Sequence, residues 1–154
     1  MDAARTPDDE AYAAPPVTRM AIAVLALVGL LVAAYLSMYK LGLISELTCT
    51  IGSCEQVQAS PWAVFLGLPV SVWGLGAYAT ILAVAVAGLQ PRFVDARWVA
   101  LALFAMSAVG VAFSGYLTYV EAFVIEMWCQ WCVISAIIVT LIFFLSIPGL
   151  RRAR

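Results

Sequence analysis

Apolar residues fill four long stretches of this chain, and short polar segments separate them. Each stretch is close to the roughly 20 residues that an α-helix needs to cross the hydrocarbon core of a bilayer. The pattern therefore predicts an all-α integral membrane protein, a bundle of four transmembrane helices within residues 19–148. The expected spans cover about residues 19–39, 70–89, 98–124 and 128–147.

The length of the fourth span decides where the sequence "WCQWC" lies. From Val133 to Ile147 the apolar run has only 15 residues, too few for about 30 Å of hydrocarbon at about 1.5 Å per residue. A helix that starts at Trp128 is long enough, and it places Cys129 and Cys132 in its first turn. Thiols three residues apart share one helix face there, and the helix dipole favours a thiolate.

The polar segment between the first two spans carries a second pair of cysteines. Residues 40–60 contain Gly, Ser, Thr and Glu without a spanning pattern, so they predict a loop outside the hydrocarbon that bears Cys49 and Cys54. The next nine residues, "PWAVFLGLP", open on a proline and are short and apolar. They predict an interfacial half-helix over residues 61–69.

Both ends of the chain are expected to be tails. Residues 1–18 are acidic and rich in Pro and Ala, which is typical of a disordered segment, and Pro148 and Gly149 close the last helix before the basic tail 149–154. If both termini are cytoplasmic, seven of the eight Lys and Arg residues lie inside and only Lys40 lies outside. This bias predicts a multi-pass membrane protein with both termini inside and both cysteine pairs on the outer, oxidising side.

Composition narrows the chemistry that is available to the chain. It is 65% hydrophobic and 11% charged, with a mean hydropathy of +1.03, which excludes an ordinary soluble domain. There is no His, the commonest general base and metal ligand. Every Asp, Glu, Lys and Arg is expected in a loop or near a helix end, so no buried charge predicts a proton path.

The four cysteines allow three readings. Cys49 and Cys54 could form a structural disulfide, or all four thiols could bind one zinc ion, which would make the chain a non-enzymatic membrane protein. The third reading is a redox relay, because a CxxC at a helix start suits reversible oxidation and a flexible loop pair can exchange electrons with it. No flavin or haem motif is present, so a membrane quinone is the economical electron acceptor.

Four motifs together resemble the vitamin K epoxide reductase family. They are "CTIGSC" after the first span, "SCEQVQASPW", "FLGLPVSVWGLGAY" at the start of the second span, and "WCQWC" at the fourth. The loop pair precedes the CxxC, whereas in the functionally similar DsbB-type oxidases the CxxC comes first. The resemblance implies a four-helix bundle that encloses a quinone, ubiquinone or menaquinone, beneath an extracytoplasmic loop and half-helix.

The resemblance also implies a role for each cysteine. Cys132 would react with the quinone, and Cys129 would be its exchange partner. Cys54 would carry electrons to Cys129, and Cys49 would form the mixed disulfide with a substrate protein. Ser60, in "ASPW", matches a serine that the family places near the reaction centre.

The sequence departs from animal members of the family in ways that bear on the substrate. Thr50 stands where they have an acidic residue, Ala136 stands where they have a tyrosine, and the loop cysteines are closer together. These departures count against vitamin K epoxide as the physiological substrate, and they do not affect the residues of the thiol relay. Many bacterial relatives continue into a thioredoxin-like domain, whereas this sequence stops at Arg154. The expected electron donor is therefore a separate periplasmic thioredoxin-fold protein of the DsbA type.

Overall fold

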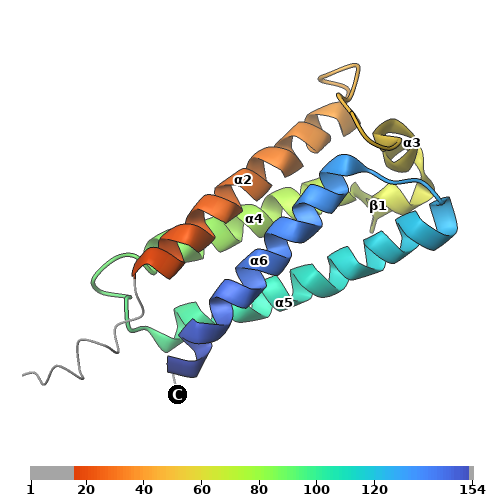
Figure 1. Cartoon of the computed structure of the whole chain (residues 1–154). Coiled ribbons are helices and arrows are strands. Elements are labelled where there is room, and N and C mark those ends of the chain that lie inside the picture. The colour runs from red at the N-terminus through yellow and green to blue at the C-terminus, as the bar shows by residue number, and fades with distance from the viewer. Residues whose placement is uncertain (1–15, 153–154) are drawn as a thin grey trace, which may run out of the picture.

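The structure, a computed structural model, describes residues 16–152 of the chain. Four long helices run the length of the molecule (Figure 1). They are α2 (Pro16–Lys40), α4 (Val70–Ala87), α5 (Arg97–Val120) and α6 (Gln130–Arg152). Most of the tail predicted at 1–18 and the last two residues of the tail predicted at 149–154 lie outside the described residues.

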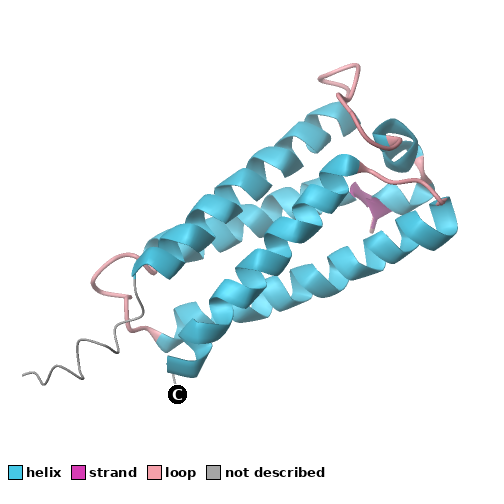
Figure 2. Ribbon diagram, viewed as in Figure 1, coloured by secondary structure: helices cyan, strands magenta, loops and turns pink. Residues whose placement is uncertain are grey.

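All four long helices are long and apolar enough to cross a membrane, which confirms the predicted fold class. Helix α2 packs mainly against α4 and α6, and α5 packs against α6 and α4. Figure 2 shows that the loops are confined to the two ends of the bundle. The arrangement satisfies the backbone hydrogen bonds within each helix, as a lipid environment requires.

Close packing between the helices depends on small residues at two crossings. A Cβ atom added to Gly29 of α2 would lie 2.3 Å from the ring of Tyr78, and one added to Gly110 of α5 would lie 2.6 Å from Val139. Glycine at these positions lets the partner side chain lie directly against the backbone. The buried core around them includes Ile81 of α4.

The short helix between the first two spans is present, but it lies earlier than the sequence predicted. Helix α3 covers Cys54–Ala59, whereas the segment 61–69 forms the turn η1 (Pro61–Ala63) and a two-stranded hairpin, β1 (Val64–Phe65) with β2 (Leu68–Pro69). The prediction of a half-helix over 61–69 was therefore wrong. At the turn of the hairpin, Leu66 and Gly67 have φ angles of 52° and 81°, which a helix does not allow.

Proline does not end the last helix at the predicted position. Pro148 lies inside α6, which continues to Arg152. Proline removes one backbone donor, and membrane helices tolerate that loss better than exposed helices do. The predicted helix end at Pro148 and Gly149 was therefore wrong.

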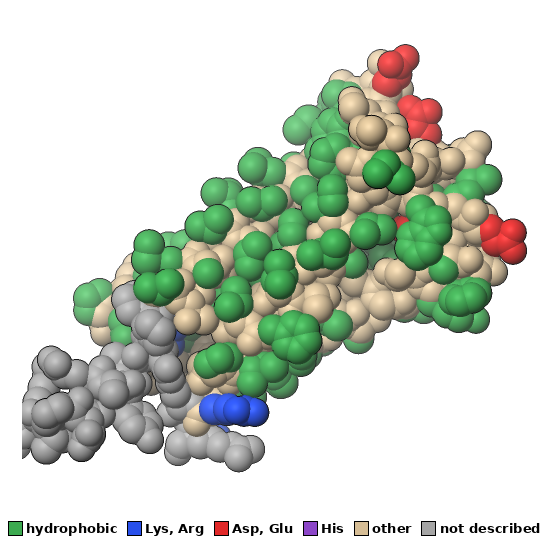
Figure 3. Space-filling view, viewed as in Figure 1, with side chains coloured by type: hydrophobic (Ala, Val, Ile, Leu, Met, Phe, Trp, Pro, Cys, Tyr) green, Lys and Arg blue, Asp and Glu red, His purple; other side chains and the backbone are tan. Residues whose placement is uncertain are grey.

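The two ends of the bundle differ in charge. One end, called the loop end below, is formed by residues 40–69 and 121–132, and Figure 3 shows acidic side chains there and basic ones at the opposite end. Hydrophobic side chains cover the surface between them, as expected for a face toward lipid. At the opposite end the buried Arg19 donates hydrogen bonds to the carbonyl oxygens of Gly88 and Phe93, which ties α2 to the link between α4 and α5.

Candidate active site

Cys129 and Cys132, called the helix pair below, lie at the start of α6, and only one of the two is in the helix. Cys132 is in the first turn, whereas Cys129 directly precedes it and forms an isolated antiparallel bridge with Gly52 of the loop. The prediction that both lie in the first turn was wrong for Cys129, because this pairing holds its backbone in an extended form. Both are free thiols; the side chain of Cys129 has no exposed surface and that of Cys132 is half-buried.

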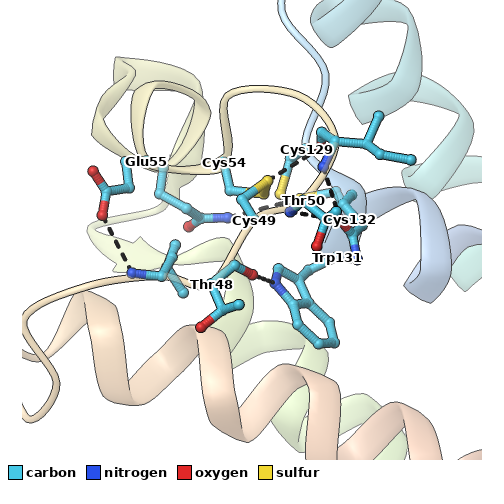
Figure 4. The surroundings of a disulfide bond; sticks show 12 residues. Thr48, Cys49, Thr50, Cys54, Glu55, Cys129, Trp131 and Cys132 are labelled. Atoms are coloured by element: carbon cyan, nitrogen blue, oxygen red, sulfur yellow. Dashed lines mark hydrogen bonds between the residues drawn. A yellow bond between two sulfur atoms is a disulfide. The ribbon is translucent and has the colours of Figure 1, made fainter.

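The loop pair is joined in a disulfide. Cys49 and Cys54 have Cα atoms 6.1 Å apart, which lies in the usual range for a disulfide. Cys49 is partly exposed, whereas Cys54 is the first residue of α3 and is 1% exposed. Figure 4 shows this disulfide facing the start of α6, where Cys129 and Cys132 lie.

The two residues between the cysteines of the CxxC hold the loop in place. The side-chain oxygen Oε1 of Gln130 accepts hydrogen bonds from the backbone N–H groups of Thr50 and Ile51, each at 3.1 Å. The indole N–H of Trp131 donates to the carbonyl oxygen of Thr48 at 2.9 Å. The spacer of the CxxC is thus a binding surface for the segment that carries Cys49.

A glycine permits the closest approach between the loop and the helix pair. Gly52 has a φ of 92°, and a Cβ atom there would lie 2.2 Å from the carbonyl oxygen of Trp128. The same oxygen accepts a hydrogen bond from the backbone N–H of Ser53 at 2.8 Å. This contact brings Cys54 and Cys129 into one small buried cluster together with Leu36, Leu47 and Val57.

A carboxyl group that the sequence did not single out lies beside the helix pair. Glu121 is 4% exposed, and its Oε2 atom accepts a hydrogen bond from the backbone N–H of Cys129 at 3.2 Å. The expectation that no charged residue would be buried was wrong here. The π-helix η2 (Glu121–Ile125) and the left-handed turn at Glu126, with a φ of 55°, reverse the chain and bring Cys129 back over the carboxyl.

The surroundings of the Cys129 thiol lower its pKa. Its pKa lies below the ordinary cysteine value because Cys132 donates a hydrogen bond to its sulfur, and this effect outweighs burial and the nearby Glu121, which both oppose ionisation. A thiolate is the reactive form in disulfide exchange. The arrangement therefore favours Cys129 as the sulfur that exchanges with a neighbouring disulfide.

A cavity of about 540 Å³ opens between the long helices and beneath α3. Cys132 lines it, and the side-chain amide of Gln58 lies against the Cys132 sulfur at 3.7 Å. Ser60, which the resemblance placed near the reaction centre, is on the wall of the same cavity and donates to the carbonyl oxygen of Val57 at 2.7 Å. The walls are mostly apolar, and their other polar side chains include Ser71, Tyr78, Glu121 and Ser135.

The amino-acid sequence of the chain was compared with models of known protein families. The model described as "Vitamin K epoxide reductase family" matches residues 20–147, which is well over half of the chain. The chain belongs to the vitamin K epoxide reductase family. It is therefore a membrane-embedded thiol oxidoreductase, and the disulfide between Cys49 and Cys54 fits that class. The resemblance drawn from the motifs is confirmed.

The family's sequence signature and the structural site coincide only in part. The matched region contains all four cysteines and Ser60, and the fold brings them to the loop end of the bundle. It also adds Glu121 and Gln58, whose burial beside the thiols depends on chain reversals that no local motif encodes. Glu121 is one of two glutamates, with Glu126, in the ten residues before the CxxC, and the sequence does not distinguish the buried one from the other.

The zinc reading needs four free thiolates at one point. Here two of the four sulfurs are already bonded to each other, as Cys49 and Cys54. Within residues 16–152 no three Cys, His, Asp or Glu side chains are grouped as metal ligands. The sulfur chemistry of the described site is therefore that of one disulfide beside one dithiol.

Proposed function

We propose that this protein oxidises the thiols of a separate DsbA-type, thioredoxin-fold protein and passes the electrons to a membrane quinone. The observation that carries the proposal is the order of burial along the four sulfurs. Cys49 is partly exposed, Cys54 and Cys129 are buried in one cluster, and Cys132 lines the cavity. The series leads from a surface that a protein can reach to a space that only a small molecule can enter.

The cavity suits a quinone in size and character. Its volume of about 540 Å³ lies within the roughly 300–1,000 Å³ that small-molecule sites occupy. Apolar walls suit a prenylated ring, and the hydroxyl of Ser71 is buried there without a hydrogen-bond partner. A quinone bound there would supply an acceptor for two electrons and two protons.

The positions of the four cysteines support a role for each. Attack by a partner thiolate on Cys49 forms a mixed disulfide and releases Cys54 as a thiolate, and the partner's second thiol then frees Cys49 and leaves the partner oxidised. When the helix pair is a disulfide, the Cys54 thiolate attacks the sulfur of Cys129 and Cys132 leaves. Attack by Cys49 on Cys54 then restores the loop disulfide and leaves Cys129 and Cys132 reduced. The described structure is in this last state.

The proposed setting is the inner membrane of a bacterium, with both termini in the cytoplasm and the loop end in the periplasm. At the loop end Lys40 is the only Lys or Arg within the described residues, whereas Arg92, Arg97 and Arg151 lie at the opposite end. This distribution supports a cytoplasmic position for the arginine-rich end, because Lys and Arg are enriched in cytoplasmic loops. Both cysteine pairs then meet the compartment where disulfides persist.

The deciding experiment is the oxidation of a reduced DsbA-type protein by the purified chain in detergent, with and without added quinone. We expect thiols to disappear in proportion to the quinone that is reduced, and Cys132→Ala to lower this turnover to background. In Cys54→Ala, a small dithiol should still drive quinone reduction through the intact helix pair. The Cys49 thiolate of this variant should attack the disulfide of the oxidised DsbA-type protein, release one partner thiolate and remain joined to the partner as a mixed disulfide. Turnover without quinone, or residual turnover in Cys132→Ala, would contradict the proposal.

A further inference from the structure

Glu121 is the one acidic side chain that is buried within the described residues. Its carboxyl accepts the backbone N–H of Cys129 and also lines the cavity that Cys132 lines. A carboxyl at this depth of a membrane protein is costly to keep unless it has a function. Among residues 16–152 it is the only carboxyl that contacts the helix pair and lines the cavity, and the roles proposed above for the four cysteines do not use it.

In the part of the chain that the structure describes, no Lys or Arg side chain pairs with the Glu121 carboxyl. The titratable groups that face it are the thiols of Cys129 and Cys132. Lys40, which is the one Lys or Arg of the loop end within the described residues, donates instead to the backbone carbonyl oxygen of Gln58. A carboxylate that no cation neutralises in an apolar site is expensive, so such a group is suited to take up and release a proton.

The redox chemistry of the helix pair needs a route for protons. Oxidation of two thiols to a disulfide removes two electrons and two protons. Cys129 has no exposed surface, and Cys132 is half-buried and lines the cavity, so a proton that leaves Cys129 has to pass a neighbouring side chain. A side chain that touches both the pair and the cavity provides the missing route.

We propose that Glu121 carries protons from the Cys129 and Cys132 thiols to the acceptor in the cavity. The Glu121 carboxylate takes up the two thiol protons one after the other, that of Cys129 as its thiolate forms and that of Cys132 as the sulfur–sulfur bond forms, and passes each into the cavity. There the quinone takes up both electrons and both protons, and Glu121 returns to its starting form. The inference rests on the proposed function, since it names a quinone as the final acceptor.

A purely structural role for Glu121 makes a different prediction, which its variants separate. In Glu121→Gln the amide oxygen can still accept the N–H of Cys129, but the side chain cannot exchange a proton. Glu121→Ala removes both properties. Glu121→Asp keeps an exchangeable proton on a shorter side chain.

The first measurement uses quinone-free protein in detergent. The infrared difference spectrum between the reduced helix pair and the pair oxidised by diamide should contain a carboxyl band that Glu121→Gln lacks. The second measurement is quinone-dependent turnover, where Glu121→Gln should lose roughly 100-fold, the scale of general acid–base catalysis. Glu121→Asp should recover part of this rate, and all variants should still form the mixed disulfide at Cys49.

The outcomes separate the two proposals. If wild-type protein reduces no quinone, the proposed function fails, and the infrared band still reports whether Glu121 changes protonation with the helix pair. If wild type turns over and Glu121→Gln matches it in rate and pH profile, the proton-carrier role is overturned. Loss in Glu121→Ala alone would also overturn it, because only the hydrogen bond to Cys129 would then matter.

Discussion

The two cysteine pairs contain the same atoms in opposite settings. Cys49 and Cys54 sit on a loop and a short helix, with one sulfur near the surface, and they are joined. Cys129 and Cys132 sit where a long membrane helix begins and are free, and Cys132 lines the cavity. The loop pair is placed to meet a protein and the helix pair to meet a small apolar molecule, so the contact between the two pairs is the critical junction.

That junction is made of backbone groups and spacer side chains rather than of large packing surfaces. Gly52 pairs with Cys129, and the spacer residues Gln130 and Trp131 hold the segment around Cys49. Such a contact can be weakened without disturbing the four-helix core. Variants at the junction should therefore separate electron delivery by a protein from chemistry at the cavity.

The largest effect is expected from Gly52→Ala. The added Cβ atom would lie 2.2 Å from the backbone carbonyl oxygen of Trp128, and the φ of 92° adds strain of about 1–3 kcal/mol for a side chain. The loop should leave the helix pair, and turnover driven by the protein partner should fall by roughly 100-fold or more, at about 1.4 kcal/mol for each factor of ten. Quinone reduction driven by a small dithiol should persist.

Gly42→Ala is the matched control for this variant. Gly42 also has a positive φ, of 75°, but nothing lies within 4 Å of its Cβ position. It therefore reproduces the backbone strain without the collision, and partner-driven turnover should stay within a few-fold of wild type. Equal losses in the two variants would show that strain in the loop, and not contact with Trp128, is what matters.

Substitutions of the two residues between the cysteines of the CxxC should lower partner-driven turnover by a smaller amount, which differs between the two positions. Gln130→Ala removes the acceptor of two backbone hydrogen bonds, each with a net contribution of about 0.5–1.5 kcal/mol, so partner-driven turnover should fall about tenfold. Trp131→Phe removes one hydrogen bond and keeps an aromatic ring against Tyr35, so its loss should be smaller. The measurement compares steady-state rates with a protein donor and with a small dithiol. A larger loss of partner-driven turnover in Trp131→Phe than in Gln130→Ala would contradict this ranking of the two contacts.

The four-helix fold could be predicted from the sequence because its signal is local. An apolar run of sufficient length specifies a membrane helix whatever its neighbours are, and all four predicted spans correspond to helices. The family motifs likewise lie within short windows, and they identified the family that the comparison confirms.

The details of the site could not be predicted because they depend on distant pairings. Cys129 lies outside α6 because it pairs with Gly52, a residue far away in the sequence. The segment 61–69 is a hairpin because of the backbone at Leu66 and Gly67, which its apolar composition does not reveal. Glu121 is buried because the chain reverses after α5, so its sequence position near a helix end was a poor guide to its environment.

The smallest predicted effect concerns the ionisation of Cys129. Because the hydrogen bond from Cys132 lowers its pKa, more thiolate is present at neutral pH than for an ordinary cysteine. The reduced protein should therefore gain stability as the pH rises through this pKa toward the ordinary thiol value of about 8.5, and lose that gain as the pH falls. The measurement is the thiolate ultraviolet absorbance of quinone-free protein as a function of pH.

Two variants isolate the cause of this shift, and each leaves Cys129 as the only free thiol. Cys132→Ser keeps a hydroxyl donor next to the Cys129 sulfur, whereas Cys132→Ala removes it and leaves burial and Glu121, which both oppose ionisation. The titration midpoint should therefore be lower in Cys132→Ser than in Cys132→Ala. Equal midpoints would mean that the second cysteine does not tune the first, and the reactivity of the helix pair would then have to come from its position before α6.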